Sequence, residues 1–314
     1  MRIGWRQYIR SKLQRKSQYD AVGISLSEDT ASFCALKQTK DGIAVKLYHE
    51  TPIGKWQQAL SQWAADNGIG AARCSVSLSS HLYEILQVEK PTVPDAELRQ
   101  ALTWSVKELT KGNVENPVFD YFDPPTKSSG VDQVNVAVIE HQHLEAVIKA
   151  TVNAGLTLER VSVEELSICD VLPFSDEPVL TLLQKAGEEI QLYIIKRGQL
   201  YFSRTLKGFE NLGSFSVDEL QMGVMDSLTV QIQRSMDYFE SQLRQAPVRK
   251  VLFNIEAANS HAIGEQIADI MRVDAAPFEL PVTIADSIST GVTYQCIGGA
   301  LPLIRGEHSE GQAA

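Results

Sequence analysis

Long apolar runs are missing from this sequence of 314 residues, and so is a secretory leader. No uninterrupted apolar run is longer than about four residues, whereas a helix that spans a membrane needs about twenty. The N-terminus is basic but lacks the apolar stretch of about 7–15 residues that a signal peptide carries. We therefore expect a soluble, intracellular protein without a transmembrane helix.

Paired cysteines and metal-binding motifs are missing too. The four cysteines lie far apart and form no Cys-x-x-Cys pair, which argues against a zinc site and against a disulfide framework: Cys34, Cys74, Cys169 and Cys296. His141 and His143 have no cysteine or third histidine near them in sequence, so we expect no metal. With 12 prolines, 44% hydrophobic and 22% charged residues, the composition is globular, and the length suggests about two domains.

Acidic residues outnumber basic residues by 39 to 29, but the excess is unevenly distributed. The net charge of −10 disfavours nucleic acid as the main partner. Residues 1–16 contain six basic residues and no acid, so the other 298 residues carry 23 basic against 39 acidic groups. The chain is therefore an acidic body that carries a basic N-terminal arm at residues 1–18.

The arm has the pattern of an amphipathic helix, with one apolar stripe flanked by basic residues. Such a helix suits an anionic membrane surface, where each basic residue contributes about 1 kcal/mol, or a partner protein. The residues predicted to contact the membrane are Arg2, Trp5, Arg6, Ile9, Arg10, Lys12, Leu13, Arg15 and Lys16. The alternatives are a helix folded onto the acidic body and a disordered arm, because a free helix of about fifteen residues is marginal.

Two halves of the body show the same order of predicted elements. The first half predicts three antiparallel strands, a helix and a buried strand, at 21–26, 32–38, 44–48, 55–67 and 74–78. The second half predicts three strands, a long helix, a strand and a helix, at 179–183, 190–196, 199–205, 216–242, 251–253 and 261–271. Further helices are predicted at 96–111, 144–154, 166–171 and 290–300, and further strands at 134–139 and 161–164. The repeated order indicates an internal structural duplication.

Several segments resemble the PilM family of type IV pilus assembly proteins. Residues 19–27 (YDAVGISLS) resemble the family's first strand and phosphate loop, and residues 88–98 (VEKPTVPDAEL) resemble the start of its inserted subdomain. The residues at 120–121 (DY) and 161–167 (VSVEELS) match later landmarks, and 231–239 (QIQRSMDYF) is similar to the long helix of its second half. The short chain with a basic arm is most similar to the branch that serves the mannose-sensitive haemagglutinin (MSHA) pilus.

The resemblance implies a fold and a division into domains. The fold would be α/β, of the duplicated, actin-like (ribonuclease H-like) ATPase type. The first domain would span 19–175 and include a small inserted subdomain at about 84–140. The second domain would span 176–305, followed by a polar tail at 306–314.

The sequence departs from the family's pattern at the implied nucleotide site. Ser25 stands at the family's metal-positioning aspartate and Ser27 at its glycine, while the carboxylates of Glu28 and Asp29 would repel a triphosphate. In the second half, residues 184–186 read Gln-Lys-Ala instead of Asp-Ile-Gly, and residues 254–257 (NIEA) lack the paired glycines of the adenosine turn. The positions left at this degenerate site are Ser25, Ser27, Thr30 and Gln184. ATP with Mg²⁺ is therefore disfavoured as a cofactor, and hydrolysis is not expected.

By resemblance, we expect a cytoplasmic scaffold that is peripheral at the inner membrane. It would bind the cytoplasmic N-terminus of a PilN-like inner-membrane protein, which is the MshJ-like protein in the MSHA system. Self-association into a homo-oligomer is a further alternative. Two alternatives from other classes stay open as well. The chain could be a working ATPase of the actin-like fold, or a membrane-attached, filament-forming protein similar to FtsA.

Four smaller features are better explained by structural roles than by catalytic or binding roles. Ser79 and His81 lack the Gly-x-Ser-x-Gly elbow of a hydrolase, so we expect no catalytic triad there. Glu164 and Glu165 are interpreted as solvated charges. The glycine pair at 298–299 is interpreted as a site of close packing. The tryptophans predicted to pack into the core are Trp56, Trp63 and Trp104.

Overall fold

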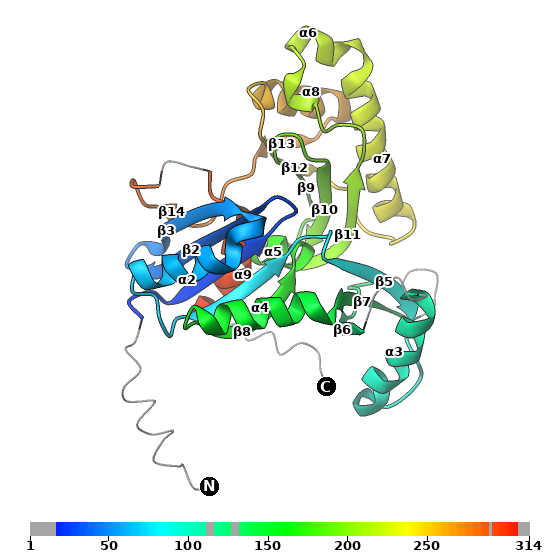
Figure 1. Ribbon diagram of the computed structural model, residues 1–314. Coiled ribbons are helices and arrows are strands. Elements are labelled where there is room, and N and C mark those ends of the chain that lie inside the picture. The colour runs from blue at the N-terminus through cyan, green and yellow to red at the C-terminus, as the bar shows by residue number, and fades with distance from the viewer. Residues whose placement is uncertain (1–16, 111–115, 127–131, 289–290, 307–314) are drawn as a thin grey trace, which may run out of the picture. The chain divides into compact units, whose positions relative to one another are not determined.

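The computed structural model describes residues 17–110, 116–126, 132–288 and 291–306 (Figure 1). The membrane contact predicted for residues 1–16 lies outside the described residues, as does the polar tail from residue 307. The described residues divide into two compact units. The first contains those up to Phe122, within Val134–Val171 and from Pro281 onward, and the second contains those within Asp123–Gln133 and Leu172–Leu280. None of the described helices is long and apolar enough to cross a bilayer.

A six-stranded sheet forms the centre of the first unit, in the order β14-β3-β2-β1-β4-β8. Its strands are β1 (Ala21–Leu26), β2 (Thr30–Thr39), β3 (Gly42–Pro52), β4 (Arg73–Leu78), β8 (Thr157–Val163) and β14 (Thr283–Ile284). β1, β2 and β3 form an antiparallel meander, in which Gly42 supplies the positive φ of 126° that the turn after Asp41 needs. β4 runs parallel to β1 and β8 runs parallel to β4. The predicted strands of the first half are confirmed.

Helices cover both faces of this sheet (Figure 1). They are η1 (Ile53–Lys55), α2 (Trp56–Asp66), α4 (His141–Asn153), α5 (Glu164–Val171) and α9 (Tyr294–Arg305). On one face, Leu60 of α2 and Val147 of α4 join Ile24 of β1 in a single hydrophobic core. On the other face, α9 packs against β1 so closely that a Cβ at Gly23 would lie 1.8 Å from the carbonyl oxygen of Cys296. The absence of a side chain at Gly23 therefore allows α9 to pack this closely on β1.

A separate three-stranded sheet, ordered β5-β7-β6, interrupts the first unit. Its elements are β5 (Tyr83–Glu89), α3 (Asp95–Thr110), β6 (Pro117–Phe122) and β7 (Gln133–Glu140). Leu98, Leu102 and Val106 of α3 pack with Val136 in a core of its own. The prediction that Trp104 is buried is wrong, because its side chain is 76% exposed. The spacing of four between the buried leucines and valine fixes the inner face of α3, and Trp104 lies about 200° around the helix from Leu102.

The second unit repeats the element order of the first. Its elements are β9 (Val179–Gln184), β10 (Ile190–Lys196), β11 (Gln199–Leu206), η2 (Leu212–Ser214), β12 (Lys250–Ile255), α8 (Ser260–Met271) and β13 (Asp274–Pro277). The sheet order is β11-β10-β9-β12-β13. Arg197 and Gly198 both have positive φ, 54° and 71°, which closes the predicted two-residue hairpin. The predicted strands and the helix at 261–271 are confirmed.

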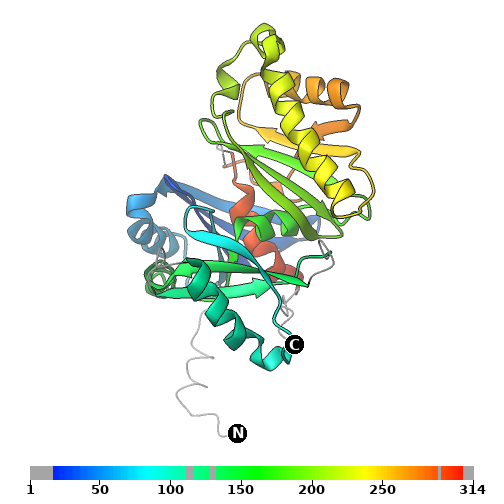
Figure 2. The same ribbon diagram turned by 90° about the vertical axis from the view of Figure 1, so that its right-hand side faces the viewer.

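The long helix predicted at 216–242 is broken near its start. It consists of α6 (Val217–Glu219), the π-helical turn η3 (Leu220–Val224) and α7 (Met225–Ser241). Ser216 caps the start in a capping box with Glu219. The break falls at Met222 and Gly223, where Gly223 adopts a φ of 102° that a continuous helix cannot contain. α7 and α8 pack on the sheet of the second unit around Leu228, and Figure 2 shows α7 lying across its strands.

The last part of the chain differs from the predicted domain boundary. The sequence placed residues 176–305 in one domain, whereas the structure assigns the chain from Pro281 to the first unit. There β14 pairs with β3, and α9 packs against β1, β4 and α5. The helix runs over Tyr294–Arg305 rather than 290–300. The physical reason is the glycine pair, since a Cβ at Gly298 would lie 2.0 Å from the carbonyl oxygen of Ser167 in α5, which agrees with the predicted close packing.

Candidate nucleotide site

Ligands of open α/β sheets bind at the carboxyl ends of parallel strands. In the first unit these ends belong to β1, β4 and β8, at Leu26, Leu78 and Val163. The strand register aligns one serine from each of four strands just before this edge: Ser32, Ser25, Ser77 and Ser162. The edge where an actin-like ATPase would hold phosphate and metal is therefore lined by hydroxyl groups.

The turn between β1 and β2 brings three of the predicted site residues together. Ser27 N–H donates to the carbonyl oxygen of Thr30 at 2.8 Å, which leaves Glu28 and Asp29 as an exposed two-residue loop. The carbonyl oxygen of Asp29 accepts from the N–H of Ile53 at 2.8 Å and so fixes the loop to the end of β3. Ser25 lies behind this turn with 4% of its surface exposed. Two carboxylates therefore occupy the tip of the loop, and a buried hydroxyl lies where the sequence resemblance implies a metal-positioning aspartate.

His81 interacts electrostatically with the nearby carboxylates of Glu28 and Asp29. Burial lowers the pKa of His81, and the two carboxylates oppose this effect. Its Nδ1 lies 3.3 Å from Ser79 Oγ. Among the described residues, no group of three His, Cys, Asp or Glu side chains is arranged to hold a metal ion. His81 therefore lies near two carboxylates and near the imidazole of His143, which also lowers its pKa, and no metal cluster is present in the described part of the chain.

The interpretation of Glu164 and Glu165 as solvated charges is wrong. Their side chains open α5 directly after β8, and the residues are only 5% and 8% exposed. Tyr83 donates a short hydrogen bond from its hydroxyl to a carboxylate oxygen of Glu165. Burial raises the pKa of the Glu165 carboxyl, while the bond from Tyr83 lowers it. Their place after a buried parallel strand and at a helix N-terminus is the signal in the sequence that could have indicated this burial.

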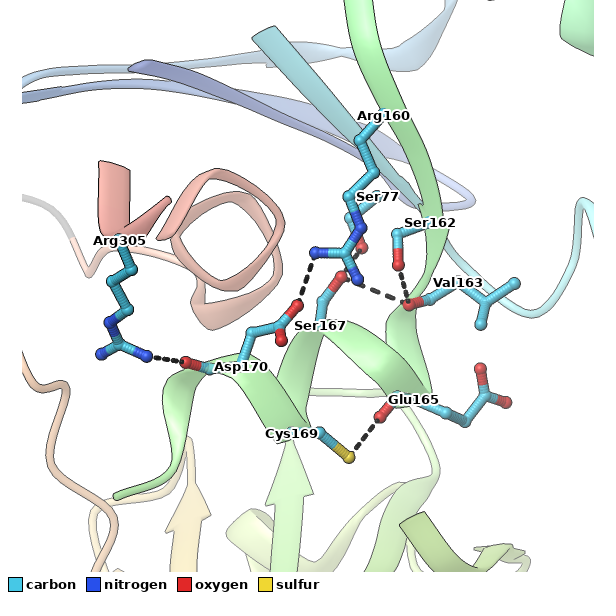
Figure 3. Close-up of polar contacts among 9 residues, drawn as sticks. All are labelled: Ser77, Arg160, Ser162, Val163, Glu165, Ser167, Cys169, Asp170 and Arg305. Carbon is cyan, nitrogen blue, oxygen red and sulfur yellow. Dashed lines mark hydrogen bonds and ion pairs between the residues drawn. The ribbon is translucent and has the colours of Figure 1, made fainter. Parts of the chain in front are cut away.

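Polar contacts connect β4, β8, α5 and α9 behind these carboxylates (Figure 3). Ser77 and Ser167 share a buried hydrogen bond of 2.8 Å, and Ser167 also donates to the carbonyl oxygen of Val163. Arg160 and Asp170 form an ion pair of 2.6 Å, with side chains that are only 17% and 22% exposed. The serine and ion-pair groups therefore have partners within the fold, which indicates a structural role for them.

The second unit holds the remaining predicted residue, Gln184, at the carboxyl end of β9. Gln184 is 6% exposed, and its Nε2 donates to the carbonyl oxygens of Glu188 at 2.7 Å and Phe209 at 2.8 Å. The amide therefore connects the turn between β9 and β10 to the segment that follows β11. The next loop group, the N–H of Ala186, donates to the carboxylate of Glu256 at 3.3 Å.

Glu256 comes from the segment after β12 in which the adenosine turn was expected. In an active phosphate loop, backbone N–H groups bind the negative charge of the phosphates. In this unit an N–H group of that loop is bonded to a carboxylate of the chain itself. The same contact would set a carboxylate against any phosphate group that approached the loop.

The sequence matches no family model, and no curated protein matches it either. Solved structures do match. The PilM–PilN type IV pilus biogenesis complex superposes with a TM-score of 0.61 over 91% of this chain and 96% of the matched chain, at 16% identity. The chain has the actin-like ATPase fold.

A second actin-like structure agrees with this assignment. The cytoplasmic domain of EpsL, an inner-membrane component of the type II secretion system of Vibrio cholerae, matches with a TM-score of 0.50 at 12% identity. That match covers 88% of this chain and 92% of the EpsL domain. The actin-like fold that the sequence resemblance implied is therefore confirmed over most of the chain.

Proposed function

We propose that this chain is a scaffold of a type IV pilus assembly machine, and that it binds the cytoplasmic N-terminus of a PilN-like inner-membrane protein. The observation that carries the proposal is the similarity to the PilM–PilN complex over nearly the full length of both chains. The EpsL domain, which belongs to an inner-membrane component of a secretion machine, gives related support. The two structures come from a pilus biogenesis complex and from a secretion system.

We further propose that the chain belongs to the MshI-like branch, that its partner is the MshJ-like protein, and that its place is the cytoplasmic face of the inner membrane. This part depends on the sequence resemblance and on the basic arm at residues 1–18. The arm would attach the scaffold weakly to anionic lipid while the partner holds it specifically. Two attachments to one membrane raise the effective concentration of each without a new contact.

We also propose that the scaffold works without hydrolysing ATP. The groups at the degenerate site support this proposal: Ser25 has no charge to organise Mg²⁺, the Gln184 amide is bonded to backbone carbonyl oxygens, and Glu256 accepts from the loop amide of Ala186. Phosphoryl transfer depends on a metal ion and on positioned charge, which these groups do not supply.

Co-purification tests the partner. The full chain should co-purify with the full-length MshJ-like or PilN-like protein in detergent, and should not co-purify with a version that lacks its cytoplasmic N-terminal segment. Equal recovery of the chain with both versions would contradict the proposed binding site on the partner.

A further inference from the structure

The second unit ends in an unpaired strand edge. β11 has eight residues, lies at the end of its sheet and pairs with β10 along one side only. No other strand of the described chain pairs with its outer side. A long free edge presents a row of backbone N–H and C=O groups that another chain can pair with, so natural proteins usually protect it.

The other sheet edges carry more protection than β11. β13 has four residues and ends in Pro277, and β14 has only two residues. β6 begins with Pro117 and contains Asp120, β5 contains Glu84 and Glu89, and β8 carries two charged residues held in ion pairs. β11 has no proline and no acidic residue, and its one charged residue is Arg204. Apart from a β-bulge, β11 therefore carries the least protection among the edge strands of the described chain.

Aromatic side chains of β11 and α7 pack against one another beside the edge. The strand register shifts around Tyr201, a β-bulge that lets both Tyr201 and Phe202 contact α7. The ring of Tyr201 lies 5.6 Å from that of Phe239, and the ring of Phe202 lies 5.3 Å from that of Tyr238. Tyr238 is itself 40% exposed. Aromatic and β-branched residues in an added strand gain stability from such cross-strand neighbours.

The charge around the edge indicates what would pair with it. The segment 196–207 (KRGQLYFSRTLK) contains four basic residues and no acid, in a body that is strongly acidic elsewhere. Arg197 is paired with Asp176 at 2.7 Å, whereas Arg204 is exposed and has no ion-pair partner among the residues that the structure describes. A second copy of this strand offers basic side chains and no acidic one, so it supplies no opposite charge to Arg204 and Lys207.

We propose that β11 accepts an extended, acidic segment of a partner protein, which adds a strand to this sheet with alternating apolar and carboxylate side chains. Main-chain hydrogen bonds would supply affinity, and Arg204 would select acidic strands. This partner segment is distinct from the one in the proposed function. Cytoplasmic segments next to a membrane span carry an excess of Lys and Arg, which suits them poorly to a basic edge. A scaffold with two such sites joins two different components.

A designed peptide tests this inference. The probe is a fluorescein-labelled peptide TVEVEVT, and its matched control is TVKVKVT. The full chain should bind the acidic peptide saturably and at least about tenfold more tightly than the basic one, equivalent to about 1.4 kcal/mol. Bound peptide should slow backbone hydrogen exchange within 199–206.

Two charge reversals locate the contact. Arg204→Glu should weaken binding of the acidic peptide about tenfold. Arg249→Glu, an exposed residue just before β12, should leave it within about twofold. Equal affinity for both peptides, unchanged exchange in β11 or an unaffected Arg204→Glu variant would overturn the proposal. A dimer of the full chain that Arg204→Glu alters would also overturn it in favour of a second copy. Neither charge reversal should affect binding of the PilN-like segment, so failure here is distinguishable from failure of the proposed function.

Discussion

The hydroxyl of Tyr83 donates a hydrogen bond to the buried carboxylate of Glu165. Tyr83 is the first residue of β5, and Glu165 lies in the first turn of α5, so the contact connects the three-stranded insert to the main sheet of the first unit. Burial and the nearby carboxylates raise the pKa of Tyr83, which keeps its hydroxyl protonated as a donor at every ordinary pH. The pair is a structural contact at the edge where a nucleotide would bind.

Tyr83→Phe removes the donor and leaves a buried acceptor without its partner. We expect the free energy of unfolding to fall by about 1–3 kcal/mol, measured by urea denaturation. Tyr121→Phe is the matched control, because Tyr121 is in the same insert and its hydroxyl makes no hydrogen bond with a described residue. A loss below about 0.5 kcal/mol in Tyr83→Phe would show that the contact contributes little.

Glu165 makes stability depend on pH in the opposite sense to a salt-bridged carboxylate. Its pKa is raised in the folded state, mainly by burial. Its contribution is therefore fully present below the unfolded pKa and is lost as the pH rises through the folded value. Glu165→Gln keeps an acceptor for Tyr83 and removes the titration. The stability of this variant relative to the wild type should rise between pH 4 and pH 8, and a difference that is flat or falls over that range would contradict the burial of this carboxylate.

Gly298→Ala should strongly destabilise the first unit. The added Cβ would lie 2.0 Å from the backbone oxygen of Ser167 and 2.7 Å from Val171, and backbone atoms cannot rotate away as a side chain can. We expect a loss of about 1–3 kcal/mol or more by thermal or urea unfolding. Gly54→Ala is the control, since a Cβ there meets nothing within 4 Å. Equal stability of the two variants would show that α9 does not pack in this position.

Removal of residues 1–18 should weaken binding to anionic vesicles. The segment contains six basic residues, and each contributes about 1 kcal/mol near an anionic surface. Co-sedimentation with vesicles of mixed phosphatidylglycerol and phosphatidylcholine measures the effect, and vesicles of phosphatidylcholine alone are the control. Unchanged sedimentation of the shortened chain would exclude the arm as the membrane contact.

Local patterns in the sequence predicted most of the strands and turns. Alternating burial is a property of neighbouring residues, and the turns at Gly42 and Gly198 need a positive φ that glycine allows. The strands that were missed are β5 and β6 of the insert and the short β13 and β14. Such strands depend on partners far away in the chain, as β14 does on β3, and their own residues show little periodicity.

Burial at the candidate site could not be read from the sequence. Glu165 resembles a surface acid until the hydroxyl of Tyr83, 82 residues earlier, is placed beside it. Gln184 was correctly located at the end of a strand, but nothing local indicates that its amide binds Phe209. Trp104 shows the opposite error, since a large apolar residue on a helix was assigned to the core and lies exposed. Each of these depends on tertiary packing between segments that are far apart in the sequence.

The proposed function requires that the chain bind a partner's peptide without using nucleotide. Isothermal titration of the full chain with the cytoplasmic N-terminal peptide of the PilN-like protein, in the presence and absence of Mg²⁺-ATP, is the decisive measurement. We expect saturable binding with the same Kd in both conditions, and no heat when Mg²⁺-ATP alone is titrated. Peptide binding that requires ATP, tight binding of ATP itself, or no peptide binding at all would contradict it.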